Sequence, residues 1–139
     1  MFSIPSQQRT APKELIQMAK GQANDILMNI RGIDYIMLCS TDGFELASVY
    51  KKNPYNSTKL AAVSSSILAM VSAFLNEIQL TGCQSITLDA ENGKAILTSI
   101  PAPNHPMVMV TLSNKDVLLG QLLYSLKQAS AAIAAADQA

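Results

Sequence analysis

The stretch STKLAAVSSSILAMVSAFLNEIQL, residues 57–80, has the length and spacing of one long helix but lacks the charged face of a helix that meets water. Its only charges, Lys59 and Glu77, lie near the ends. A helix that is apolar or small on all sides is normally buried on all sides. One face is therefore predicted to pack on the protein's own sheet and the other on a second molecule. The stripe assigned to the sheet consists of Leu60, Val63, Ser64, Ile67, Val71, Phe74 and Ile78.

The composition agrees with a protein that hides part of its surface in an assembly. A chain of 139 residues is sized for one domain with a real core. Charged residues make up 14% of it, whereas about 25% is typical of soluble domains. The net charge is zero and no run of Lys or Arg occurs, so the electrostatic footprint of a nucleic-acid binder is missing.

The chain is expected to be cytoplasmic and not inserted in a membrane. Its first residues, MFSIPSQQRTAPK, contain no apolar core of signal-peptide length, and no run of 18 uninterrupted apolar residues occurs. Cys39 and Cys83 are far apart and lie in apolar surroundings. They are predicted to be buried free thiols and not a disulfide framework.

The segment before the long helix is predicted to be a tail, a helix and a hairpin. Residues 1–11 lack periodicity and are expected to be a flexible tail, followed by a single domain over residues 12–136. The first helix is predicted to run from Pro12, which suits a first turn, to about Arg31, with Gly32 as its stop. Within it, the glycine at position 21 either weakens the helix by about 1 kcal/mol relative to Ala or permits a close crossing.

Strands are predicted on both sides of Asp42-Gly43, over IDYIMLCS and ELASVY, because this dipeptide favours a two-residue type I′ turn with positive φ at both positions. Both faces of IDYIMLCS are largely apolar, so it is expected to be a central strand. Three more strand-like runs follow Gly82: QSITLD, KAILTSI and MVMVTL. The last helix has few anchors in its tail AAIAAADQA, and its end is expected to fray.

The predicted order of elements is α-β-β-α-β-β-β-α, an α+β fold. Short turns between the strands imply a five-stranded antiparallel sheet with helices packed on it. The long central helix is expected to cover one face of the sheet and the terminal helices the other.

No active site is visible in the sequence. His105, the only histidine, lies between Asn and Pro and is expected to be a solvated loop residue without catalytic or metal-binding partners. Turn-forming and solubilising roles account for Asp42, Asp89 and Glu91. The SSS run of the long helix lacks a GxSxG context, and no glycine-rich phosphate loop occurs. The protein is predicted to be non-enzymatic and to need no cofactor or metal.

Four consecutive segments together resemble the Roadblock/dynein light chain family: GIDYIMLCSTDGFELASV, LAAVSSSILAMVSAFL, LTGCQSITLDAENGKAILTSI and MVMVTLSNKDVLLGQLLYSLKQA. The resemblance covers roughly residues 13–133 and rests on the order of the parts. It implies a profilin/Roadblock-like α/β/α sandwich. It also implies a homodimer in which the long helices of two subunits pack together and sheet edges meet.

The resemblance also implies a role. Bacterial and archaeal relatives bind and regulate small Ras-like GTPases, while eukaryotic relatives are light chains or scaffold subunits. The chain is identified as a member of the prokaryotic GTPase-regulator branch. Arg31, the only arginine in the matching region, lies at a helix end and does not stand out as an arginine finger. Any effect on a GTPase is therefore expected to work through the partner's own catalytic groups.

The expected function is that of a homodimeric adaptor that binds a small Ras-like GTPase and modulates its nucleotide cycle. The first alternative is a passive dimeric scaffold in a larger complex. The second is a small-molecule sensor, although no polar cluster in the sequence marks a pocket. The dimer interface is predicted on the small-residue face of the long helix: Ala62, Ser65, Ser66, Ala69, Met70, Ala73, Asn76 and Glu77.

Overall fold

The computed structural model describes residues 11–52 and 55–138. The predicted tail lies outside the described residues except for Ala11, which is buried in the core. The elements are α2 (Lys13–Asn29), β1 (Ile33–Ser40), β2 (Glu45–Tyr50), α3 (Ser57–Glu77), β3 (Ser85–Ala90), β4 (Gly93–Ile100), β5 (Met107–Asn114) and α4 (Leu119–Ala136).

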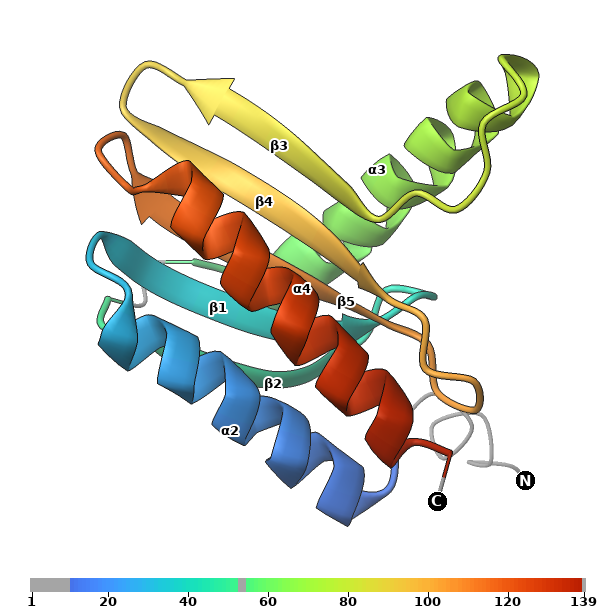
Figure 1. The fold of residues 1–139 in the computed structure, drawn as a ribbon, viewed down its shortest axis with the longest axis horizontal. Helices are drawn as coiled ribbons and strands as arrows, with labels where there is room; N and C mark the ends of the chain where they lie inside the picture. Colours follow the sequence, from blue (N-terminus) through green and yellow to red (C-terminus); the bar gives the residue numbers. More distant parts are fainter. Residues whose placement is uncertain (1–10, 53–54, 139) are drawn as a thin grey trace.

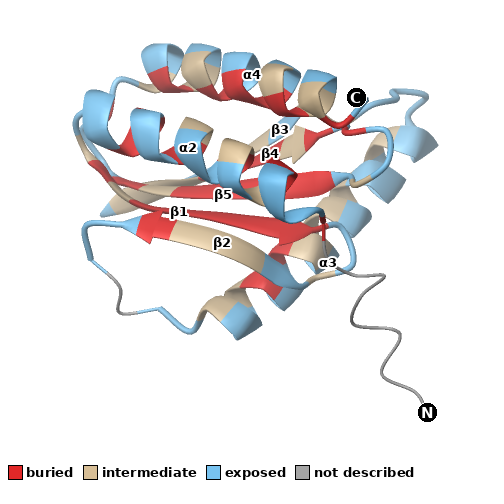
Figure 2. Cartoon of the chain, turned by 90° about the horizontal axis from the view of Figure 1, so that it is seen from below, coloured by how far each residue is buried: buried red, intermediate tan, exposed pale blue. Residues whose placement is uncertain are grey.

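The five strands form one sheet in the order β2-β1-β5-β4-β3, and every neighbouring pair is antiparallel. Helices α2 and α4 lie side by side on one face, and α3 crosses the other (Figures 1 and 2). The predicted fold class is thereby confirmed. Because α3 follows β2 and precedes β3, it connects the two edges of the sheet.

Two hydrophobic clusters lie on the two faces of the sheet. The larger lies under α2 and α4 and includes Ile36 and Ile96, together with Leu122 of α4. The smaller lies under α3 and includes Tyr35 and Met37 of β1. Strand β1 thus contributes to both clusters, as its two apolar faces predict, and lies inside the sheet.

The two cysteines differ in burial. Cys39 is fully buried in the cluster under α3, and this burial raises the pKa of its thiol to about 12. Cys83 is only half-buried. The prediction of two buried free thiols therefore holds for Cys39 alone.

The β1–β2 turn differs from the predicted two-residue type I′ turn. The N–H of Gly43 donates to the carbonyl of Ser40 over 3.0 Å, and the N–H of Ser40 donates to the carbonyl of Phe44 over 2.9 Å. Gly43 has a φ of 97°, but Asp42 does not have a positive φ. The connection is a three-residue hairpin loop closed by a glycine in the left-handed region, and the register shift between Leu38 and Cys39 agrees with such a loop.

The structure decides between the two alternatives for Gly21 and differs from the expected frayed end of α4. A Cβ added at Gly21 of α2 would meet nothing within 4 Å, so this glycine does not mark a close helix crossing. The end of α4 is anchored, because the buried carboxylate of Asp137 accepts hydrogen bonds from the β4–β5 loop. One donor is the ring of His105, which is therefore not a solvated histidine without partners.

Candidate interaction surface

Helix α3 is fixed to the sheet at its first turn. The Oδ1 atom of Asn56 accepts a hydrogen bond from the N–H of Lys59 over 3.1 Å and so caps the helix. The carboxylate of Glu45 on β2 accepts a hydrogen bond from the hydroxyl of Ser57 over 2.7 Å. These two contacts set where the helix starts and the direction in which it leaves β2.

The first half of α3 also contacts the β1–β2 turn. The hydroxyl of Ser65 donates a hydrogen bond to the carbonyl of Thr41. A Cβ at Gly43 would lie 3.4 Å from the Cα of Ala62, so the turn packs directly against the helix. Two residues of the predicted dimer interface, Ala62 and Ser65, thus lie next to the subunit's own hairpin.

The predicted orientation of the large-residue stripe is wrong in part. Phe74 is 62% exposed, and Val63 and Ile78 are also exposed instead of lying on the sheet. The residues that face the sheet are Leu60, Ala61, Ser64, Ile67 and Leu68. The second half of α3 runs beyond the sheet (Figure 1), so its large side chains have no sheet beneath them.

The predicted interface residues lie mostly on the exposed part of α3. Ser65 is half-buried, and the other seven are exposed: Ala62, Ser66, Ala69, Met70, Ala73, Asn76 and Glu77. Met70, 66% exposed, is the largest apolar member of this group. Apart from Ala62 and Ser65 beside the hairpin, these side chains are exposed within the subunit, and the role of all eight residues in a dimer stays a prediction.

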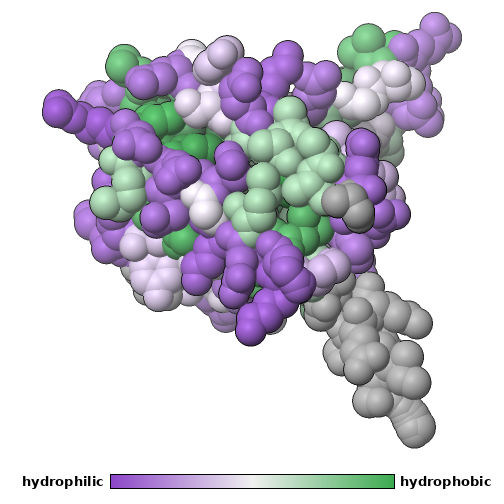
Figure 3. Space-filling view, turned by 60° about the horizontal axis from the view of Figure 1, so that its bottom comes forward, coloured by the Kyte–Doolittle hydropathy of each residue, from purple (hydrophilic) through white to green (hydrophobic). Residues whose placement is uncertain are grey.

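A groove lies between the second half of α3 and the segment that leads to β3. Its volume is about 510 Å³. Leu68 and Leu75 of the helix line it, together with Leu80 and Cys83 of the following segment. In Figure 3 the projecting end of α3, at the upper right, shows a hydrophobic group next to hydrophilic side chains.

Strand β3 continues this surface at the edge of the sheet. It pairs with β4 only, so one side of its backbone has no strand partner in the described chain. Leu88 is exposed, and Ile86 is half-buried against the cluster under α3. Exposed edge strands readily pair with another chain. The projecting half of α3 and the β3 edge together are the candidate surface for protein binding.

Among the described residues, the candidate surface contains no metal-binding cluster and no ion pair on α3. No group of three or more His, Cys, Asp or Glu side chains that could hold a metal ion occurs among the described residues. The two ion pairs in the described part of the chain join Lys94 to Asp89 and His105 to Asp137, and none of these residues lies on α3. The exposed apolar side chains of this surface are suited to apolar contact with a protein.

One helix within the described ranges, Ser57–Glu77, is long and apolar enough by length and composition to cross a membrane. Core helices of soluble proteins pass the same test. Here the helix joins strands β2 and β3 of a single sheet. A membrane crossing would place these two strands on opposite sides of the bilayer and break the sheet.

Comparisons with solved structures identify the fold. The gliding protein MglB from Thermus thermophilus is similar with a TM-score of 0.80 and 19% identity, over 93% of this chain and 95% of that chain. Myxococcus xanthus MglB has a TM-score of 0.76 and 14% identity, over 91% of this chain and 96% of that chain. A Roadblock/LC7 domain from Streptomyces avermitilis has a TM-score of 0.71 and 10% identity, over 79% of this chain and 89% of that chain.

The sequence itself matches a family model described as the Roadblock/LC7 domain over residues 21–102. A comparison with curated proteins finds no match. The family match spans more than half of the chain and includes β1, β2, α3, β3 and β4, which carry the candidate surface. The chain belongs to the Roadblock/LC7 domain family.

Proposed function

We propose that this protein is a homodimeric, non-enzymatic regulator in the cytoplasm, which binds a small Ras-like GTPase and modulates its nucleotide cycle. The observation that carries the proposal is the exposed apolar half of α3 beside an unpaired sheet edge. Large exposed apolar surfaces on small domains mark sites of protein association. The family match supplies the class of protein in which such a surface acts.

The exposed small-residue face of α3 supports the proposal of a homodimer. A two-fold axis brings the same patch of both subunits together, so the patch must be complementary to itself. Small side chains such as Ala69 and Ala73 allow two α3 helices to approach closely, and both are exposed. An antiparallel pairing of two β3 edges obeys the same symmetry. A solved structure named "MglB with tetrameric arrangement" shows that a protein of this fold forms assemblies.

The GTPase partner is inferred from the resemblance to bacterial and archaeal Roadblock proteins and from the similarity to MglB. Arg31, just after α2, is the only arginine within the described ranges. It lines a cavity on the α2/α4 side of the sheet together with Gly32 and Leu118. It lies apart from the α3 surface. Regulation is therefore proposed to act by positioning catalytic groups that belong to the GTPase.

The proposal is tested with the tagged protein purified from its native host. The expected result is co-purification of a small GTPase, saturable binding of that GTPase to the purified dimer, and a changed rate of single-turnover GTP hydrolysis or nucleotide release. A dimer that binds the GTPase without changing either rate would be a tether, as in the scaffold alternative. A dimer that binds no small GTPase at all would overturn the proposal.

A further inference from the structure

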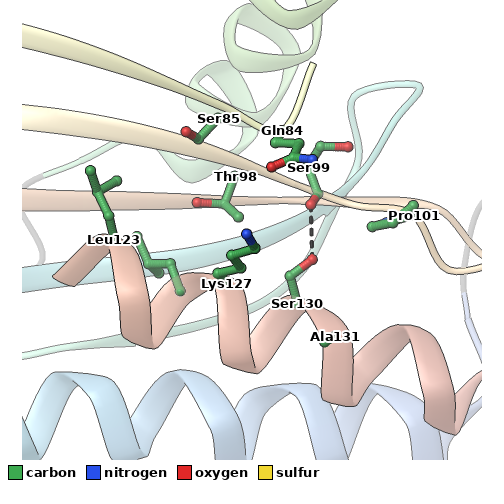
Figure 4. Close-up of a pocket in the computed structure, with 10 residues that line it drawn as sticks. Gln84, Ser85, Thr98, Ser99, Pro101, Leu123, Lys127, Ser130 and Ala131 are labelled. Carbon is green, nitrogen blue, oxygen red and sulfur yellow. Dashed lines mark hydrogen bonds between the residues drawn. The ribbon is translucent and has the colours of Figure 1, made fainter. Parts of the chain in front are cut away.

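A cavity of about 320 Å³ lies between α4 and the β3–β4 side of the sheet, on the face of the sheet opposite to α3. Figure 4 shows side chains of α4 on one side of this space and side chains of the strands on the other. The residues that line it are Gln84, Ser85, Thr98, Ser99, Pro101, Leu123, Leu126, Lys127, Ser130 and Ala131.

Thr98 is the unusual member of this lining. It is only 5% exposed, and its Oγ1 atom has no hydrogen-bond partner. Its side chain hangs from β4 into the space toward α4 (Figure 4). A buried hydroxyl without a partner destabilises the folded state by about 1–3 kcal/mol, so most buried hydroxyls are hydrogen-bonded. This oxygen is closed off from solvent-sized molecules in the present rotamer, so a molecule in the cavity would bond it once the Thr98 side chain turns toward the space.

Lys127 supplies the charge. It is the one charged residue in the lining, and its side chain extends from α4 toward the strands (Figure 4). No acidic side chain in the described part of the chain pairs with it. The hydroxyl of Ser130 donates to the carbonyl of Ser99 over 3.0 Å, which leaves its oxygen free to accept. An anionic group in the cavity would find an unpaired ammonium at this point.

Apolar side chains complete the walls, chiefly Leu123 and Leu126 of α4 and Pro101 after β4. Cavities that bind small molecules are mostly apolar, contain a few convergent polar groups, and begin at about 300 Å³. The volume here lies at the small end of that range. We propose that the cavity binds a small organic monocarboxylate, whose carboxyl group bonds Lys127 and Thr98 and whose short apolar chain lies against the leucines.

The test uses hexanoate as the probe, with hexanamide as its uncharged counterpart, and the full-length protein labelled with ¹⁵N. The expected result is a saturable change in the amide chemical shifts at Thr98, Lys127 and Ser130 with hexanoate. Hexanamide is expected to bind at least about tenfold more weakly, because its carbonyl oxygen carries no charge to form an ion pair with the ammonium. Lys127→Met should weaken hexanoate binding to a similar extent, while Lys20→Met on the exposed side of α2 leaves it unchanged.

Thr111 offers a matched control for Thr98, because its Oγ1 atom is also buried without a partner but does not line the cavity. Thr98→Val and Thr111→Val each remove such a hydroxyl at nearly constant volume. Only Thr98→Val is expected to weaken hexanoate binding, by at least about threefold, even if both variants unfold at higher temperature. The proposal is overturned if hexanoate causes no saturable shift at 20 mM, if hexanamide binds equally well, or if Thr98→Val and Thr111→Val bind alike.

Discussion

The carboxylate of Asp137, just after α4, accepts a hydrogen bond from Nδ1 of His105 over 2.7 Å. The backbone N–H groups of Asn104 and His105 donate to the other carboxylate oxygen, each over 2.7 Å. Asp137 is 6% exposed. Burial by itself raises the pKa of this carboxyl group, but the hydrogen bonds from His105 and Asn104 outweigh it, and the pKa lies below its ordinary value of 3.8.

Asp137→Asn is expected to lower the free energy of unfolding at pH 7 by about 1–3 kcal/mol, because it removes the charge from three hydrogen bonds. A carboxyl group whose pKa is lower in the folded state stabilises the protein above the unfolded-state pKa. That stabilisation is lost as the pH falls through the folded-state pKa. The difference between the wild type and Asp137→Asn should therefore be full near neutral pH and shrink below pH 3.8.

Urea unfolding at several pH values measures this difference. Asp25→Asn, on the exposed surface of α2, is the control and should change stability little at any pH. Equal stabilities for Asp137→Asn and the wild type at pH 7 would show that the hydrogen bonds between Asp137 and the β4–β5 loop do not hold the end of α4 in solution.

Helix α3 ends with a hydrogen-bond pattern that normally uses glycine. The N–H of Leu80 donates to the carbonyl of Leu75 over 2.8 Å, and the N–H of Gln79 donates to that of Asn76 over 3.1 Å. This is the Schellman arrangement, whose residue after the cap is left-handed. Gln79 fills that place with a φ of 66°, the only positive φ of a non-glycine residue in the described ranges.

Gln79→Gly is accordingly expected to raise the free energy of unfolding by about 1 kcal/mol, because glycine adopts this φ without steric penalty. Gln128→Gly, on the exposed side of α4, provides the opposite case and should lower it by about 1 kcal/mol. Thermal unfolding of the two variants in parallel gives the sign of each change. A loss of stability in Gln79→Gly would contradict the assigned end of the helix.

The order of the elements could be predicted because most of them have a clear periodicity and a glycine or proline beside them. Strand β1, for example, is apolar on both faces and lies inside the sheet. The orientation of α3 could not be predicted equally well, because both of its faces lack charge. Hydrophobic periodicity alone did not show that Phe74 extends beyond the sheet while Ser64 lies on it.

Contacts between distant residues were also beyond prediction from the sequence. His105 and Asp137 are separated by 32 positions, and neither has a neighbour in sequence that points to the other. The cavity lined by Thr98 and Lys127 is assembled from β4 and α4. Only the packing of the helix on the sheet brings these side chains to one place.

Substitution of two glycines by alanine is expected to change the stability of the protein in opposite directions. Gly43 has a φ of 97°, and a Cβ there would lie 3.4 Å from the Cα of Ala62 and 3.6 Å from the Cβ of Ser65. Gly43→Ala is expected to lower the free energy of unfolding by about 1–2 kcal/mol through backbone strain at this positive φ, since the added Cβ would make only ordinary van der Waals contact with α3. Gly21 lies within α2, where a Cβ would meet nothing within 4 Å. Gly21→Ala should therefore raise the free energy of unfolding by about 1 kcal/mol.

Chemical denaturation of both variants checks these signs. Both substitutions add the same methyl group. A difference between their effects on the free energy of unfolding therefore reflects the backbone conformation at each position and not a general effect of alanine. If Gly43→Ala were as stable as the wild type, the left-handed turn against α3 would not be the form of the hairpin in solution.

The candidate surface on α3 predicts which charges abolish self-association. Ala69 is exposed in the subunit, so Ala69→Glu should fold normally, as should the double variant Ala62→Glu with Ala73→Glu. In a dimer that packs these residues, the new carboxylates would be buried without partners and close to their symmetry mates. The dissociation constant of the dimer is expected to rise at least about tenfold, which corresponds to about 1.4 kcal/mol.

Light scattering over a concentration series measures the change, with circular dichroism to verify folding and Gln17→Glu on α2 as an exposed control. Phe74→Glu separates the two sides of α3, since Phe74 belongs to the large residues that extend beyond the sheet. A dimer that survives Ala69→Glu but not Phe74→Glu would place the interface on the large-residue side. If both variants stay dimeric, α3 does not form the interface, because neither side of its exposed half could then accept a buried charge.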